Sequence, residues 1–328
     1  MIISRAPFRI TLAGGGTDLP EYYKKYGGAV TSMAIDKYIF VSFKRNILDD
    51  FIRLQYLKTE VVDNANKLSH ERARAVLKEF DILNRCEISS MADLPSRSGL
   101  GSSGSYLVAL INCLKEYKNL PMSRDDVANL ACRIEMEDLG EPVGKQDQFI
   151  ASYGGIRTFT ISRNGAVETR DINLSNTDID TFTKHCCIYY TGFQRSASKI
   201  LKTQTTNKEN FEDQMQKICD LSNRFVDALE TKNFDQYGAL LDEHWRYKKQ
   251  LSSTMTNSSI DKVYAHLKEK KLILGGKIIG AGGGGFLMVY VPEKFESVDR
   301  HMASNGMTKV NYSVDTKGVK TLYQARGK

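Results

Sequence analysis

The sequence has few of the features that mark several large protein classes. Its six cysteines form no Cys-x-x-Cys pair and its five histidines no His-x-x-x-His spacing, which argues against zinc and against a disulfide framework. Six prolines without a Gly-X-Y period exclude a collagen-like chain. No apolar run of about 18 residues is present to span a membrane. The N-terminus lacks an apolar leader, so we expect no export and a cytoplasmic location.

The composition is that of a globular chain. Its 328 residues are 41% hydrophobic and 26% charged, enough for a sizeable core and long enough for two domains. The excess of 46 Lys and Arg over 39 Asp and Glu gives a net charge of +7. This excess suits an anionic substrate but is too small and too dispersed to indicate nucleic-acid binding. Because the cysteines form no Cys-x-x-Cys pair, we expect them to be buried free thiols.

Apolar patterning predicts strands and helices in mixed order. Ser123 with Asp126 forms a capping box at one helix start, and Trp245 falls on the apolar face of another helix. The polar residues 173–183 predict a domain boundary, which gives domains 1–178 and 179–328. Helices are expected near residues 21–26, 67–83 and 123–140 and as three segments between 211 and 267. Strands are expected near 35–43, 86–91, 155–161, 167–172, 185–191, 286–291, 308–314 and 319–324.

Glycine is concentrated in three loops, each beside a strand or helix end. They lie at residues 13–20, 94–105 and 275–285, and the third holds seven of the chain's 25 glycines. Glycine permits positive φ and lets backbone N–H groups approach a ligand closely. Such N–H groups at a helix N-terminus bind anions. Three loops of this kind predict a site for an anionic ligand.

The middle loop contains Gly99-x-Gly101-x-x-Gly104, which matches the dinucleotide fingerprint. That fingerprint requires a strand after the helix, and here a second helix begins at Ser123 instead. An NAD-dependent oxidoreductase is therefore only an alternative. No Walker P-loop sequence occurs. What remains is a phosphate cradle at a helix start, where Ser102, Ser103 and Ser105 offer hydroxyls and one of them could ligate Mg²⁺.

Two acidic residues downstream complete a possible site for phosphoryl transfer. Glu135 lies on the second helix and Asp147 in a Gly- and Pro-containing loop after it. Each has a structural alternative, Glu135 as part of a solvated helix face and Asp147 as a turn carboxylate. Beside a phosphate cradle, a Mg²⁺ ligand and a carboxylate base would together carry out phosphoryl transfer.

Taken in order, the three loops resemble the GHMP kinase family of small-molecule kinases over nearly the whole chain. The first motif is Arg-Ala-Pro-Phe-Arg-Ile at residues 5–10, followed by Gly-Gly-Gly-Thr-Asp at 14–18. The second is Pro-Ser-Arg-Ser-Gly-Leu-Gly-Ser-Ser-Gly at 95–104, with Gly104 where the family commonly has Ala, a small-for-small change. The third is Lys-Ile-Ile-Gly-Ala-Gly-Gly-Gly-Gly-Phe at 277–286.

The resemblance implies the fold and the cofactors. We expect a two-domain α+β GHMP kinase fold, with a left-handed βαβ unit in the N-terminal domain, a ferredoxin-like C-terminal domain and the site between them. ATP and Mg²⁺ would be the cofactors. Asp147 would be the catalytic base, Arg9 would favour the ionised base or stabilise developing charge, and Ser103 with Glu135 would hold Mg²⁺. The resemblance assigns the ATP phosphates to the backbone of Ser98, Gly99, Leu100, Gly101, Ser102, Ser103, Gly104 and Ser105.

Within the family, the first motif is most similar to that of kinases acting on D-glycero-D-manno-heptose 7-phosphate. Galactokinases carry Glu-His where this chain has Gly15-Gly16. The resemblance implies formation of the 1,7-bisphosphate for nucleotide-activated heptose and surface polysaccharide, with neither nucleic acid nor membrane as partner. A fucokinase is the nearest alternative, and a non-catalytic sugar sensor of this fold is another. The implied substrate contacts are Gly14, Gly15, Gly16, Thr17, Asp18, Gly282, Gly283, Gly284 and Arg195.

A sugar that already carries a phosphate needs a second anion site. The best candidate is the strand end and expected helix start at residues 191–199, where Arg195 and Ser196 could bind a phosphate. The same segment could equally be a capped surface turn. Lys145 is a second candidate for the sugar phosphate, and Tyr56-Leu57-Lys58 is a first guess for the adenine contact.

Overall fold

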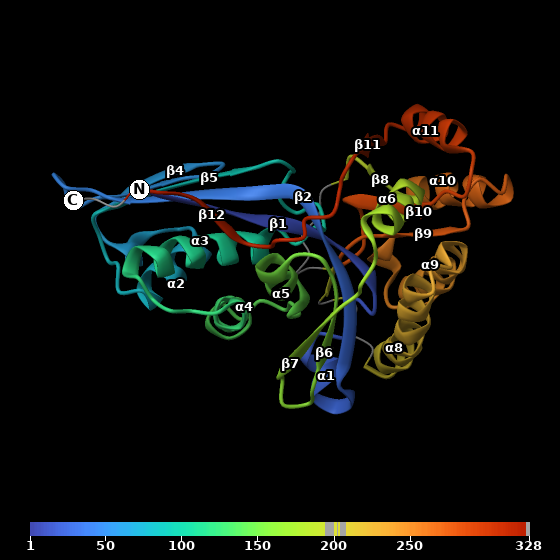
Figure 1. Ribbon diagram of the computed structural model, residues 1–328, viewed down its shortest axis with the longest axis horizontal. Helices are drawn as coiled ribbons and strands as arrows, with labels where there is room; N and C mark the ends of the chain where they lie inside the picture. The colour runs from blue at the N-terminus through green and yellow to red at the C-terminus, as the bar shows by residue number, and fades with distance from the viewer. Residues whose placement is uncertain (194–199, 202, 204–207, 326–328) are drawn as a thin grey trace.

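The computed structural model describes residues 1–193, 200–201, 203 and 208–325. Within this part of the chain, the strands form an eight-stranded sheet and a four-stranded sheet. The two sheets lie at opposite ends of an elongated molecule (Figure 1). No helix in the described ranges has the length and apolar character needed to cross a bilayer.

The first sheet is built around two long antiparallel strands, β1 and β2. β3 and β5 are parallel, with α2 in the connection between them, so they form the predicted βαβ unit. The order along the sheet is β12-β1-β2-β5-β3-β4. Outside this order, β6 pairs with β2, and β7 pairs with β6. The strands are β1 (Ile2–Ala13), β2 (Gly28–Arg45), β3 (Ile52–Gln55), β4 (Thr59–Val62), β5 (Cys86–Ala92), β6 (Ile156–Ile161), β7 (Val167–Asp171) and β12 (Lys320–Gln324).

Helices cover this sheet. α3 packs on β1 and β2, and α2, α4 and α5 lie on the same side (Figure 1). Ser123 and Asp126 form the predicted capping box at the start of α4, which continues into a π-helical turn (Ile134–Asp138). From Ala6 onward β1 is buried on both faces, because three helices pack against it. These are α3, α5 and α8 (Lys208–Glu230), the last of which belongs to the C-terminal half of the chain. The helices are α1 (Pro20–Tyr26), α2 (Glu71–Glu79), α3 (Ser102–Lys118), α4 (Arg124–Arg133) and α5 (Gln146–Tyr153).

The second sheet has the predicted ferredoxin-like topology. Its strands are antiparallel in the order β11-β8-β10-β9, and helices connect β8 to β9 and β10 to β11. The three predicted helices are α8, α9 and α10, whereas α11 was not expected. The elements are β8 (Cys186–Tyr190), α8 (Lys208–Glu230), α9 (Phe234–Lys249), α10 (Ser258–Glu269), β9 (Gly275–Ile278), β10 (Phe286–Tyr290), α11 (Phe295–Ser304) and β11 (Thr308–Val310).

Two features of the structure bear on the expected domain boundary. Most of the polar segment 173–183 forms α6 (Asn176–His185), which begins with a capping box from Ser175 to Asp178. The last strand of the chain lies with the first sheet. β12 pairs antiparallel with β1, with Gln324 opposite Ile2, so the end of the chain completes the first sheet (Figure 1).

The core contains the side chains expected there and one unusual histidine. Trp245 is buried, and all six cysteines are free thiols, five of them buried. His244 on α9 is fully buried with its ring edge-on to Phe225, and neither ring nitrogen has a hydrogen-bond partner among the described residues. Burial, reinforced by Lys277 and Lys248, lowers the pKa of His244 well below its usual range.

We therefore expect the free energy of unfolding to fall in mild acid. Below pH about 6.5 the His244 side chain binds a proton in the unfolded chain but not in the folded chain. The free energy of unfolding therefore decreases as the pH decreases. One such group contributes at most about 1.4 kcal/mol per pH unit. Urea unfolding at pH 5.5 and 7.5 measures this loss, and His244→Phe should reduce it. An equal loss in the variant would assign the pH dependence to other groups.

Candidate active site

The three glycine-rich loops meet around a cavity of about 890 Å³. It lies where β1, the start of α3 and the start of α5 meet the loop between β9 and β10. Residues from all three motifs line it, namely Arg9, Gly15, Gly16, Asp18, Gly99, Gly101, Ser102, Ser103, Asp147, Gly280 and Ala281.

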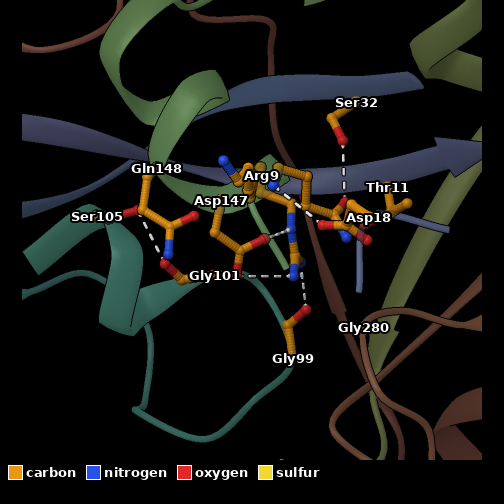
Figure 2. Close-up of polar contacts among 12 residues, drawn as sticks. Arg9, Thr11, Asp18, Ser32, Gly99, Gly101, Ser105, Asp147, Gln148 and Gly280 are labelled. Atoms are coloured by element: carbon orange, nitrogen blue, oxygen red, sulfur yellow. Dashed lines mark hydrogen bonds and ion pairs between the residues drawn. The ribbon is translucent and has the colours of Figure 1, made fainter. Parts of the chain in front are cut away.

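Arg9 and Asp147 form a paired group at the centre of this cavity (Figure 2). Arg9 Nε donates to Asp147 Oδ1 at 2.7 Å and Arg9 Nη2 to Oδ2 at 3.2 Å, while Nη1 donates to the Gly99 carbonyl. The pairing of β1 with β2 shifts its register between Pro7 and Phe8, just before Arg9. The Arg9 backbone N–H donates to Leu100 O at 3.0 Å, which ties β1 to the second loop. The carboxylate is thereby held in one orientation with 22% of its side chain exposed, able to accept a proton from a bound hydroxyl.

The second loop forms the start of α3, as expected for an anion cradle. Gly101 is the N-cap residue with φ +79°, and a Cβ there would lie 3.1 Å from Arg9 Cγ and 3.2 Å from Asp147 Cγ. Glycine is therefore needed both for the backbone conformation and for the close approach of Asp147. The N–H groups of the first turn of α3 can bind phosphate oxygens. Ser102 and Ser103 line the cavity beside them.

Other residues of the second loop support the cradle from outside the cavity. Ser98, Leu100, Gly104 and Ser105 are buried, and the Ser105 hydroxyl donates to Pro7 O at 2.7 Å. A Cβ on Gly104 would lie 2.8 Å from Asp147 Cβ, so alanine at this position would displace the carboxylate in this chain.

The first loop places one buried carboxylate in the cavity wall. Asp18 accepts from Gln146 N at 3.1 Å and from Gly16 N at 3.3 Å. Burial raises the pKa of Asp18 above its ordinary value and the nearby Asp147 adds to the rise, while the hydrogen bond from Gln146 N opposes it. Gly14 and Thr17 do not line the cavity. The Thr17 hydroxyl donates to Gly14 O at 2.8 Å, which fixes the loop.

Gln146 is a cavity residue that sequence reasoning missed. Its Oε1 accepts from the Thr11 hydroxyl at 2.6 Å and from the Ser32 hydroxyl at 3.1 Å. These two bonds orient the amide, and its backbone N–H holds Asp18. The only signal in the sequence was its position next to Asp147.

Glu135 is buried, so the alternative of a solvated helix face is wrong. Its Oε1 pairs with Arg72 at 2.9 Å and its Oε2 accepts from Gln148 Nε2 at 2.7 Å. The described residues contain no group of three or more His, Cys, Asp or Glu side chains that could hold a metal ion. Mg²⁺ needs few protein ligands when nucleotide oxygens and water supply the rest. Ser103 lines the cavity, whereas Glu135 does not line it and is tied to Arg72 and Gln148.

The third loop contacts the second loop, but not through Gly282, Gly283 and Gly284, the three glycines named as substrate contacts. Gly282 packs on Met255, Gly283 N donates to Met255 O at 2.7 Å, and Gly284 lies against Phe193. None of Gly282, Gly283 and Gly284 lines the 890 Å³ cavity. Gly280 and Gly285 make the close contact instead, with the backbone of residues 98–99.

An aromatic and aliphatic wall forms the far end of the cavity. The Tyr56 and His70 rings lie edge to face with centroids 4.8 Å apart, and His70 lies 5.0 Å from the Tyr106 ring. Leu57 and Met91 complete this wall. Of the three residues guessed for the adenine contact, Tyr56 and Leu57 thus line the same cavity as the phosphate cradle, and Lys58 does not. The wall offers aromatic and aliphatic side chains against which a base can pack.

Of the two candidates for a second anion site, Arg195 and Ser196 lie outside the described residues. Lys145 lines a separate cavity of about 460 Å³, where its ammonium donates to Gly165 O at 2.6 Å and lies 5.8 Å from the Tyr23 ring centroid. Lys248 on α9, which sequence reasoning passed over, lines the larger cavity.

Comparisons with known proteins agree with this geometry. The family described as GHMP kinases N terminal domain matches residues 65–155. A D-glycero-alpha-D-manno-heptose 7-phosphate kinase of Campylobacter jejuni is 29% identical over 98% of each chain. A putative sugar kinase structure from Campylobacter jejuni has a TM-score of 0.77 and 27% identity, covering 98% of this chain and 97% of that one.

A D-glycero-D-manno-heptose 1-phosphate kinase structure from Bacteroides thetaiotaomicron shares the fold, with a TM-score of 0.81 and 22% identity over 99% of this chain and all of that one. The full-length fold, the three loops in one cavity and the matching N-terminal domain agree with one another. Residues 65–155 match the N-terminal domain of GHMP kinases, and the chain is similar over nearly its full length to sugar kinases.

Proposed function

We propose that the chain transfers the γ-phosphoryl group of ATP to the anomeric hydroxyl of D-glycero-D-manno-heptose 7-phosphate. The products are ADP and the 1,7-bisphosphate, which would enter the synthesis of nucleotide-activated heptose and surface polysaccharide in the cytoplasm, where ATP is supplied. The observation that carries this proposal is the similarity to the Campylobacter jejuni heptose 7-phosphate kinase over 98% of both chains. The pair Gly15-Gly16 in the cavity, in place of the Glu-His of galactokinases, supports it.

Asp147 would take the proton of the anomeric hydroxyl as the sugar oxygen forms its bond to the γ-phosphorus and the bond to the bridging oxygen of ADP breaks. The bidentate contact with Arg9 supports this role, because it fixes the direction of both carboxylate oxygens. Arg9 would also stabilise the negative charge that develops on the transferred group.

The nucleotide would lie with its phosphates on the first turn of α3 and its base on the wall formed by Tyr56, Leu57 and His70. Support comes from the single cavity that spans both regions. Mg²⁺, held by Ser103 and by Glu135 once Arg72 withdraws, would supply neutralisation of the phosphate charge.

The sugar would contact Asp18 and the backbone of Gly15 and Gly16. A buried carboxylate held by two backbone N–H groups is suited to orienting sugar hydroxyls. Arg195 remains a proposal for the sugar's phosphate, made from the sequence alone.

The proposal is tested by ADP release from Mg-ATP with a panel of acceptors. The panel contains D-glycero-D-manno-heptose 7-phosphate, mannose 6-phosphate, L-fucose and galactose. We expect turnover with the heptose 7-phosphate and little with the others. Turnover with L-fucose instead would identify a fucokinase. Silence across the panel with ATP still bound would favour the sensor alternative.

A further inference from the structure

His70 carries a polar group that the proposed placement of the base does not use. It precedes α2, and its Nδ1 accepts from Ala73 N at 3.2 Å, which caps the helix. A backbone amide can only donate, so Nδ1 carries the lone pair and the proton of the neutral ring lies on Nε2. Burial, reinforced by the charge of Arg72, lowers the pKa of His70 below its ordinary value, which keeps the ring neutral near neutral pH. The helix cap therefore makes Nε2 a hydrogen-bond donor.

The surrounding residues hold this ring in one position. Glu60 accepts from His70 N at 3.1 Å and from the Tyr56 hydroxyl at 2.8 Å, so one carboxylate fixes both the backbone of His70 and the neighbouring ring. The Tyr56 ring packs edge to face on His70, and the Tyr106 ring packs on it as well. Together with the bond to Ala73 N, these contacts fix the plane of the imidazole and the direction of its Nε2–H.

The Nε2–H of His70 opens into the cavity. Among the described residues no group accepts a hydrogen bond from Nε2, and this atom is not enclosed by protein. Because Nδ1 is directed at the first turn of α2, Nε2 lies on the side of the ring away from that turn. His70 lines the cavity beside Tyr56 and Tyr106. A few precisely placed polar groups in a mainly apolar wall are what fixes the orientation of a bound ligand.

We propose that His70 Nε2–H donates a hydrogen bond to a ring nitrogen of the nucleotide's adenine base, which makes His70 a specificity-determining residue. This inference rests on the proposed kinase function, in which the base packs on this wall. Adenine has unprotonated ring nitrogens at N1, N3 and N7, each of which accepts a hydrogen bond in the plane of the base. A fixed N–H donor can therefore bind one of them while the base lies against Tyr56 and Leu57.

The test compares ADP with 1-deaza-ADP, 3-deaza-ADP and 7-deaza-ADP, in each of which a C–H group replaces one ring nitrogen. Calorimetry with Mg²⁺ and without sugar gives the affinity of each nucleotide. In the wild type we expect one of the three analogues to bind about tenfold more weakly than ADP, because the Nε2–H then has no partner in the complex. The analogue that loses affinity identifies the nitrogen that His70 contacts.

Two variants show whether this loss of affinity belongs to His70. His70→Phe keeps an aromatic ring without the N–H, and His70→Ser keeps a side-chain cap for α2 without it. In both variants the weakened analogue should bind as tightly as ADP, since neither has the donor. His266→Phe replaces a half-buried histidine that stacks on His301 and does not line the cavity. It is the matched control and should keep the wild-type ratio of affinities.

Equal affinity of the wild type for ADP and all three analogues would overturn the proposal. An unchanged ratio in both His70 variants would overturn it too, because the nitrogen would then have another partner. Failure of the proposed function has a different signature, since the test needs no sugar. ADP binding without turnover of heptose 7-phosphate would refute the heptose assignment and leave the result on His70 standing. A wild-type protein that binds no ADP would overturn both.

Discussion

Asp147→Asn is expected to lower kcat by about 10²- to 10⁴-fold, the range for loss of a positioned proton acceptor. The amide cannot accept the hydroxyl proton, but it keeps the shape of the carboxylate beside Arg9. We expect the lower part of this range, because an anomeric hydroxyl is more acidic than an ordinary alcohol and depends less on a base. KM for the sugar should change much less than kcat.

Steady-state kinetics with heptose 7-phosphate and Mg-ATP measure this effect. Asp180→Asn, at an exposed position on α6, is the control for general loss of a negative charge and should behave as the wild type. Equal activity of Asp147→Asn and the wild type would remove Asp147 from the role of base.

Gly285→Ala is expected to reduce kcat/KM by about 10²-fold, the loss associated with a displacement of about 1 Å at a reacting centre. Gly285 has φ +83°, and a Cβ there would overlap the Ser98 carbonyl oxygen. Its backbone N–H donates to Phe193 O at 2.8 Å, so the third loop cannot simply move away. The substitution should push the second loop, and with it the phosphate cradle, out of position.

Gly306→Ala is the matched control for this prediction. Gly306 also has a positive φ, +73°, but a Cβ there meets nothing within 4 Å. Both variants therefore carry the backbone strain of a left-handed alanine, and only Gly285→Ala carries the collision. Thermal unfolding and kinetics of the two should separate stability from activity. Similar activity in both variants would mean that the contact between the two loops does not position the cradle.

Much of the site was accessible from the sequence because its parts are local. The start of α3 at the second glycine-rich loop and the capping box at Ser123 follow from residues within one helical turn. Asp147 and Arg9 were expected near each other only through the family resemblance. Their bidentate contact joins residues 138 positions apart, which no local pattern predicts.

The errors concern residues whose role depends on distant partners. Gly282, Gly283 and Gly284 looked equivalent to Gly280 in sequence, yet only Gly280 of these lines the cavity. Lys145, in a loop rich in cavity residues, turns toward Gly165 and Tyr23. Packing against neighbouring elements decides which of these residues face the cavity, and that packing produces no periodic pattern in the sequence.

By itself the sequence determined most of the strands and helices, the three glycine-rich loops and the chemical class of the site. It could do so because helix caps, apolar periodicity and glycine conformations act over a few residues. Only the tertiary structure decided that β12 completes the first sheet, that polar residues 173–183 form most of a helix, and that Lys248 reaches the cavity. These outcomes depend on contacts between segments far apart in the chain. Such contacts stabilise the structure only after the fold has brought the segments together.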